Sequence, residues 1–151
     1  MSTNDYDEPL VGVTMMLADS AQVADGRLFI LGGGVSEIGP GAQPIAIAVL
    51  VQVPWDRANI SHEWRFELLD EDGGPVLFDD QPINVNGNFE AGRPAGLPAG
   101  TPITVPMAIN FGALPLAPGN RYEWRLAVNG TAEPDWSLPF RVRPVAPPPG
   151  G

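Results

Sequence analysis

Residues 116–129 read LAPGNRYEWRLAVN, and this stretch decides the fold class. Apolar and mostly charged residues alternate within it over eight positions, and such alternation gives a β-strand one apolar and one charged face. Pro118-Gly119 before the alternation and Asn129-Gly130 after it are typical of turns. The stretch therefore predicts a half-buried strand. Its apolar face carries Tyr122, Trp124, Leu126 and Val128.

A near copy of this pattern lies earlier in the chain, at residues 60–69, and the tripeptide Glu-Trp-Arg occurs in both stretches. We expect the two to be antiparallel neighbours that each supply a tryptophan to one core. Their charged faces would then meet in cross-strand pairs of opposite sign, which set register more than stability. The charges expected to face one another are Glu63, Arg65 and Glu67 on one strand and Arg121, Glu123 and Arg125 on the other.

The rest of the chain predicts an all-β, single-domain antiparallel β-sandwich with an added N-terminal β-hairpin. Eighteen prolines and eighteen glycines fall mostly between apolar runs, as turns do, and no segment has helical periodicity. Residues 1–8 are expected to be flexible, 9–143 to form the domain and 144–151 to be an extended proline-rich tail. The other expected strands are Leu10–Leu17, Leu28–Leu31, Gln43–Val53, Pro75–Phe78, Ile83–Phe89, Ile103–Phe111 and Trp136–Val142.

The N-terminal hairpin is predicted from two apolar runs, Leu10–Leu17 and Leu28–Leu31, with a polar break between them that ends in the turn signal Asp25-Gly26. The run Gly32-Gly33-Gly34 follows. It lacks the lysine and hydroxyl residue of a phosphate-binding loop, so we expect a bulge or a close backbone approach. Residues 17–34, LADSAQVADGRLFILGGG, resemble the opening of a family of uncharacterised actinobacterial proteins that is catalogued as a domain of unknown function. The resemblance implies no activity.

From Gln43 onward the strand succession resembles an immunoglobulin-like or fibronectin-type-III sandwich. The spacing from Leu116 through Pro118-Gly119 to Tyr122 resembles the tyrosine corner of such folds, in which the hydroxyl bonds to backbone a few residues upstream. The resemblance assigns Gln43–Val53 to strand B, Ile60–Leu69 to C, Ile103–Phe111 to E, Arg121–Asn129 to F and Trp136–Val142 to G. These sandwiches host many functions, so the fold implies none.

Composition excludes several classes of function. The net charge of −10 argues against binding to nucleic-acid phosphates, and the longest apolar run, Ile45–Val51, is too short to span a membrane. The chain has no cysteine, which excludes disulfides and thiolate metal sites and fits a reducing compartment. Because no signal peptide is apparent, we expect a cytoplasmic protein. No cofactor motif is apparent either, so we expect no cofactor.

Two loops carry the candidate binding residues. In an immunoglobulin-like sandwich the B–C and F–G loops emerge at one end, the end that antibodies use for recognition. Tryptophan and arginine are enriched in interface hot spots. The alternative is that both indoles fold inward and close the end of the core. The candidates are Trp55, Asp56 and Arg57 in the first loop and Glu133, Asp135 and Trp136 in the second.

One strand is apolar on the face that should be exposed. Ala46, Ala48 and Leu50 alternate with the inward-facing residues of Gln43–Val53, although the outer face of a sandwich strand is normally polar. We therefore expect the N-terminal hairpin or a partner chain to cover this stripe, which is a candidate assembly face.

Catalytic and metal signals are weak. His62 is the only histidine, and its register with Trp64 predicts a place at the margin of the core rather than a role as a general base. Asp70 and Asp72 in an acidic hairpin are a weak alternative for a cation, but the glutamate of an EF-hand is missing. The sequence thus predicts a non-enzymatic protein-interaction or assembly module, as a homo-oligomer or within a larger particle. The alternative is a small-ligand or carbohydrate binder that uses aromatic residues at the loop end.

Overall fold

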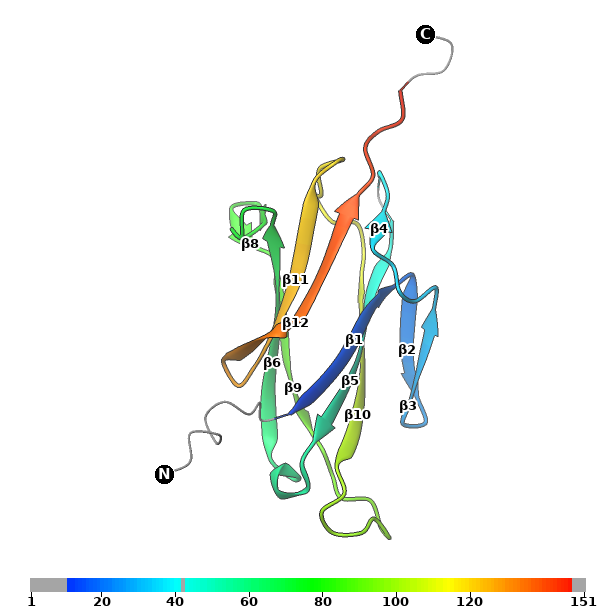
Figure 1. The fold of residues 1–151 in the computed structure, drawn as a ribbon, viewed down its shortest axis with the longest axis vertical. Helices are drawn as coiled ribbons and strands as arrows, with labels where there is room; N and C mark the ends of the chain where they lie inside the picture. The colour runs from blue at the N-terminus through cyan, green and yellow to red at the C-terminus, as the bar shows by residue number, and fades with distance from the viewer. Residues whose placement is uncertain (1–10, 42, 148–151) are drawn as a thin grey trace.

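The computed structural model describes residues 11–41 and 43–147, and within them the chain is nearly all β (Figure 1). In this described part the one helical element is the short 3-10 helix η1 (Trp55–Arg57). No helix there is long and apolar enough to cross a membrane. The strands are β1 (Gly12–Ala18), β2 (Ser20–Ala24), β3 (Arg27–Leu31), β4 (Glu37–Ile38), β5 (Ile45–Val53), β6 (Ser61–Asp70), β7 (Leu77–Phe78), β8 (Gln81–Pro82), β9 (Asn84–Glu90), β10 (Ile103–Phe111), β11 (Arg121–Val128) and β12 (Thr131–Val142).

Two sheets face each other across one hydrophobic core. The first has the strand order β1–β5–β10 and is antiparallel throughout. The second has the order β4–β12–β11–β6–β9, in which only the short β4 runs parallel to its neighbour. Two hairpins, β2–β3 and β7–β8, complete the fold. The predicted all-β antiparallel fold class is confirmed.

The core centres on Trp124 of β11, whose side chain is fully buried. Its indole stacks on Phe111 of β10 with ring centroids 4.6 Å apart, so this pair joins the two sheets. Phe66 of β6 lies edge-on to the same indole at 6.5 Å. Trp64 is half-buried and packs against the core from the side. The prediction that the two tryptophan strands are antiparallel neighbours is confirmed, because β11 pairs with β6.

The predicted ladder of opposite charges between these strands is wrong in its register. Only Arg125 lies directly opposite one of the expected partners, Glu67, whereas Arg65 faces Ala127. Both arginines instead form exposed ion pairs along their own strands, Arg65 with Glu67 at 3.3 Å and Arg125 with Glu123 at 3.2 Å. The inward-facing aromatic residues fix the register, and the exposed charges follow it.

Tyr122 forms the predicted hydrogen bond to the backbone a few residues upstream. The hydroxyl oxygen of Tyr122 accepts a hydrogen bond from the backbone N–H of Ala117 at 2.8 Å. Its ring is buried and stacks on Phe140 of β12, with centroids 5.8 Å apart. The Pro118-Gly119 turn is thereby fixed against the start of β11.

An N-terminal hairpin is present as predicted, but it is formed by other strands than those predicted. The first apolar run forms β1, which pairs with β5 and not with the run at residues 28–31. The supposed polar break contains β2, which pairs with β3 across the turn Asp25-Gly26. Both turn residues have positive φ, 52° and 71°, as the two-residue turn of a hairpin requires. Small and polar residues alternate in β2 and only Ala21 of this strand is buried, so the segment lacks the apolar alternation that predicts a strand.

The three glycines after β3 allow a close backbone approach, as predicted. The carbonyl oxygen of Leu17 accepts hydrogen bonds from the N–H groups of Gly34 at 2.9 Å and Val35 at 3.1 Å. A Cβ atom on Gly33 would lie 2.7 Å from the sulfur of Met16. Side chains here would push the hairpin away from β1.

The chain ends are described in part. The segment 1–8, expected to be flexible, lies outside the described residues, as do residues 148–151 of the tail. Residues 144–147 of the tail are exposed and have no regular structure.

Candidate functional site

The loop after β5 brings Trp55 to one end of the sandwich, where η1 holds it half-buried. The guanidinium of Arg93, from the loop after β9, lies 4.2 Å from the centroid of the indole. Its Nη2 also donates to the carbonyl oxygen of Trp55 at 2.8 Å. Asp56 and Arg57 are exposed beside them. Arg93 was not among the predicted site residues, because it comes from a stretch rich in glycine, alanine and proline that has no strand pattern.

A shallow cleft of about 430 Å³ opens beside Trp55. Gln52 and Asp56 supply its few polar side chains, so it suits a small ligand with one mainly apolar face. Its lining residues are Gly12, Gln52, Pro54, Trp55, Asp56, Gly100 and Pro102.

The turn at Asn129-Gly130 and the Trp55 loop are connected through His62. Nε2 of His62 lies 3.2 Å from the carbonyl oxygen of Arg57, and its Nδ1 lies 3.0 Å from the side-chain nitrogen of Asn129. The imidazole is 2% exposed and stacks on Phe89. With both ring nitrogens engaged by protein, His62 holds the loop end together, which agrees with its predicted place at the core margin.

The second predicted loop is not a loop. Glu133, Asp135 and Trp136 lie inside β12, where the ladder with β11 jumps from Ala132 to Ser137. Trp136 is buried in the core, whereas Asp135 is exposed and Glu133 is half-buried. The prediction that these residues lie in the second loop is wrong, because Asn129-Gly130 alone closes the hairpin and the next residues already belong to a bulged strand. Trp136 follows the alternative prediction, an indole that folds inward.

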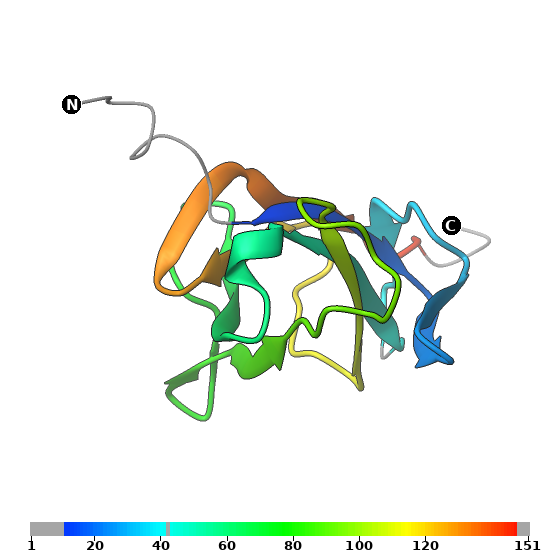
Figure 2. The ribbon, with the colours of Figure 1, turned by 90° about the horizontal axis from the view of Figure 1, so that it is seen from below.

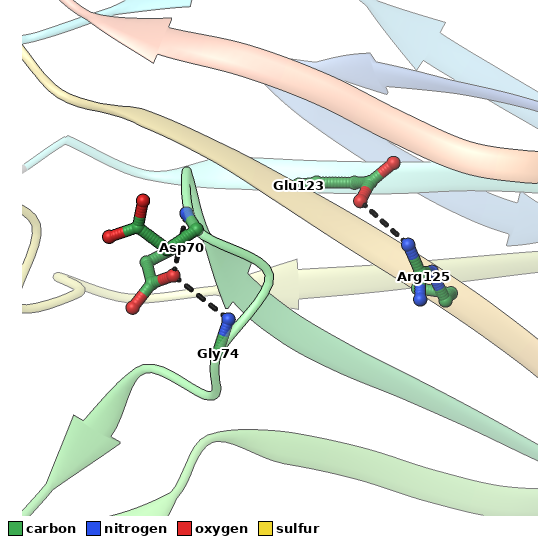
Figure 3. A network of polar contacts seen from close by, with 5 residues as sticks. Asp70, Gly74, Glu123 and Arg125 are labelled. Atoms are coloured by element: carbon green, nitrogen blue, oxygen red, sulfur yellow. Dashed lines mark hydrogen bonds and ion pairs between the residues drawn. The ribbon is translucent and has the colours of Figure 1, made fainter.

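The acidic hairpin is organised by its own backbone. Oδ1 of Asp70 accepts hydrogen bonds from the N–H groups of Asp72 and Gly74, both at 2.9 Å (Figure 3). These bonds form a tight turn after β6, which needs no ion to hold it. Within residues 11–41 and 43–147, no three histidine, aspartate or glutamate side chains come together as ligands of a metal ion.

The outer face of β6, β9 and β11 is a wide polar groove of about 660 Å³. Its ion pairs, such as that between Glu123 and Arg125 (Figure 3), run along single strands and are exposed. Exposed pairs of this kind contribute about 0–1 kcal/mol and leave their charges hydrated. The groove is therefore a solvated sheet face.

The predicted assembly face is covered within the chain itself. Ala46 and Ala48 are buried in a small cluster with Ala21 of β2, and the hairpin lies on the side of the β1–β5–β10 sheet away from the second sheet (Figure 2). Asn110 of β10 fixes the hairpin, because its side chain accepts from the N–H of Ala21 at 3.2 Å and donates to its carbonyl at 2.9 Å. Leu50 is half-buried beyond the cluster. The prediction was that the hairpin or a partner chain covers this stripe, and the hairpin covers its residues Ala46 and Ala48, so these two are not free to form an assembly face.

The β2–β3 hairpin carries exposed apolar side chains of its own. Phe29 and Leu31 alternate on the face of β3 that points away from the sandwich, and they are 54% and 69% exposed. Val23 and Ile30 are also exposed, at 41% and 38%. Large apolar side chains gathered on one small element mark an interaction site more often than scattered ones do. The hairpin is therefore the candidate interaction surface.

The comparisons with known proteins give a family without an activity. A family model described as "Family of unknown function (DUF6941)" matches residues 13–143. No curated protein and no solved structure matches the chain.

Proposed function

This chain belongs to the family of unknown function DUF6941, and we propose that it is a non-enzymatic protein-interaction module that binds through the β2–β3 hairpin. The proposal rests on one observation: Phe29 and Leu31 are more than half exposed on a strand that lies outside both main sheets. Burying one such side chain in a partner contributes about 1.5–3 kcal/mol, so two of them can anchor an interface.

The hairpin is held rigidly enough to act as a docking element. Its base is anchored by Leu17, whose carbonyl oxygen accepts hydrogen bonds from the N–H groups of Gly34 and Val35, and its middle is anchored by Asn110. An element that is ordered before binding loses less conformational entropy on association. The engagement of both nitrogens of the only histidine supports a non-enzymatic module over an enzyme.

Three further assignments are part of this proposal. The sheet orders β1–β5–β10 and β4–β12–β11–β6–β9, together with the bond from Ala117 to Tyr122, support an immunoglobulin-like topology. The absence of cysteine supports a cytoplasmic location. The resemblance of residues 17–34 to an actinobacterial family supports an actinobacterial origin, and the use of arginine at all eight lysine or arginine positions agrees with a GC-rich genome.

Affinity capture with matched variants tests the proposal. The bait would be wild type, the double variant Phe29→Ser, Leu31→Ser, or a control with Leu77→Ser and Phe78→Ser. The control residues are equally apolar, are 52% and 58% exposed, and lie on the separate β7–β8 hairpin. We expect the hairpin variant to lose the proteins, its own chain included, that wild type and control both retain. Equal capture by all three baits would refute the proposal.

A second function, binding of a small ligand or saccharide, is favoured by the cleft beside Trp55. The cleft combines the indole of Trp55 with the polar side chains of Gln52 and Asp56, and an aromatic surface beside a few polar groups suits a sugar ring. Titration of the protein with a panel of saccharides, compared with Trp55→Ala, tests this alternative.

A further inference from the structure

We infer that the partner of the hairpin is a second copy of this chain, docked by antiparallel pairing of two β3 strands about a two-fold axis at Phe29. This inference rests on the proposed function and names the partner that the hairpin binds.

The side chain of Asn110 fixes the hydrogen-bonding phase of the hairpin. It bonds both the N–H and the carbonyl of Ala21, so both of these groups point away from β3. Ala21 lies opposite Ile30, and this pair is therefore not hydrogen-bonded within the hairpin. Arg27, Phe29 and Leu31 then bond to β2, as expected when Arg27 closes a two-residue turn.

The same phase leaves the other residues of β3 with free backbone groups. The N–H and carbonyl groups of Leu28 and Ile30 point away from β2, toward the outer edge of the hairpin. In the part of the chain that the structure describes, β3 pairs with β2 alone. Figure 1 shows β3 on the outer side of the hairpin, with β2 between it and β10. Proline and charged side chains are the usual protections of an exposed edge, and β3 has no proline and a single charged residue, Arg27, at its first position.

This edge is complementary to itself. With Phe29 opposite Phe29 of the second copy, Leu28 of each chain lies opposite Ile30 of the other. Those are the residues with free backbone groups, so the pairing makes four N–H···O=C bonds and joins the hairpins into one four-stranded sheet. The central Phe29 pair is then a non-hydrogen-bonded pair, the kind that brings opposite side chains closest together. A two-fold interface requires this self-complementarity.

Charge also favours this register, although the chain carries a net charge of −10. Arg27 lies opposite Leu31 of the second copy, one position before Gly32. The carboxylate of Asp19 lies against Gly32, so each end of the pair brings an arginine near an acidic group. A five-residue edge buries little area, so we expect a weak, concentration-dependent dimer.

Sedimentation velocity at protein concentrations from about 10 µM to about 1 mM tests the inference. The fraction of dimer at each concentration gives the dissociation constant of the dimer. Phe29→Lys places two like charges side by side at the axis and should weaken dimerisation roughly tenfold or more. Phe78→Lys, on the β7–β8 hairpin, should leave it unchanged. Ile30→Pro removes an N–H that only the second copy would use, so it should also abolish the dimer. Urea unfolding of each variant establishes that it folds, and either folded hairpin variant suffices for the test.

The outcomes separate this inference from the proposed function. A monomer at all concentrations, with capture of another protein that still depends on Phe29 and Leu31, would overturn self-pairing and leave the interaction module standing. A dimer that is indifferent to both hairpin variants would place the interface elsewhere and overturn the inference. If the wild-type protein shows neither self-association nor capture that depends on the hairpin, both the proposed function and this inference are refuted.

Discussion

The side-chain nitrogen of Asn129 lies 3.0 Å from Nδ1 of His62, and this contact ties the turn after β11 to the start of β6. The oxygen of the same amide accepts from the backbone N–H of Glu63 at 2.9 Å, so the nitrogen must be the group that faces the imidazole. Nδ1 of His62 then accepts, and its Nε2 carries the proton and donates to the carbonyl of Arg57. One neutral tautomer therefore gives each ring nitrogen of His62 a hydrogen-bond partner.

Replacing Asn129 with glycine tests this network. Both Asn129 and Asn59 have positive φ, 51° and 60°, and glycine tolerates that conformation. Asn129→Gly removes two side-chain hydrogen bonds, one of them to a buried ring, and should lower the free energy of unfolding by about 2 kcal/mol. Asn59→Gly is the control, because no side-chain hydrogen bond of Asn59 is found among residues 11–41 and 43–147. Urea denaturation measures both, and equal losses would contradict the network.

Gly87 of β9 makes room for the indole of Trp64. The two residues lie opposite each other, and a Cβ on Gly87 would meet Cζ2 of the ring at 2.9 Å. Gly87→Ala should therefore lower stability by about 1–3 kcal/mol, since the rigid ring has to move. Gly92→Ala meets nothing within 4 Å and should be neutral or slightly stabilising. Thermal unfolding of both variants checks the difference, and a neutral Gly87→Ala would show that Trp64 packs elsewhere.

The strands with strong alternation could be predicted from the sequence, because burial of one face imposes a period of two. Both ends of β10 were predicted as observed, at residues 103 and 111. The ends of β5, β6 and β11 were predicted to within two residues. The strand β2 does not follow from the sequence, because Ala46 covers one of its faces and Asn110 bonds the backbone along its edge, and both residues are distant in the sequence. Local pattern does not reveal such covering.

The candidate site could be predicted only in part. The position of Trp55 in an end loop follows from Pro54 and the strands on either side. The burial of Trp136 depends on a bulge whose length no local signal sets, and the place of Arg93 depends on a long loop without periodicity. The exposed face of β3 was visible as the run RLFIL, yet its outward orientation follows only from the packing of β2 against β10.

Asp70 is expected to act on the turn after β6 and not on a cation. Its Oδ1 accepts two backbone N–H groups, and Asp70→Ala should cost about 1–2 kcal/mol of stability. Asp70→Asn keeps an accepting oxygen and should retain most of the stability that Asp70→Ala loses. Calcium added to wild type should leave the melting temperature unchanged. A calcium-dependent rise in melting temperature that Asp70→Asn abolishes would instead establish a cation site.

The two tryptophans Trp55 and Trp136 should respond differently to truncation. Trp136 is 6% exposed and packs in the main core, so Trp136→Ala should lower the free energy of unfolding by about 3–5 kcal/mol. Trp55 is half-buried under Arg93, and Trp55→Ala should cost less, about 1–2 kcal/mol, because part of its surface is already hydrated. Arg93→Ala should repeat part of that smaller loss and serves as the matched control for the contact.

Urea denaturation of the three variants measures these losses, and titration with saccharides adds a readout that stability alone does not move. If the cleft binds a ligand, Trp55→Ala removes binding from a protein that is still folded, whereas a folded fraction of Trp136→Ala retains it. A Trp136→Ala variant as stable as wild type would contradict the inward position of that indole. Equal losses from Trp55 and Trp136 would show that both close the end of the core, and would remove this end from consideration as a binding site.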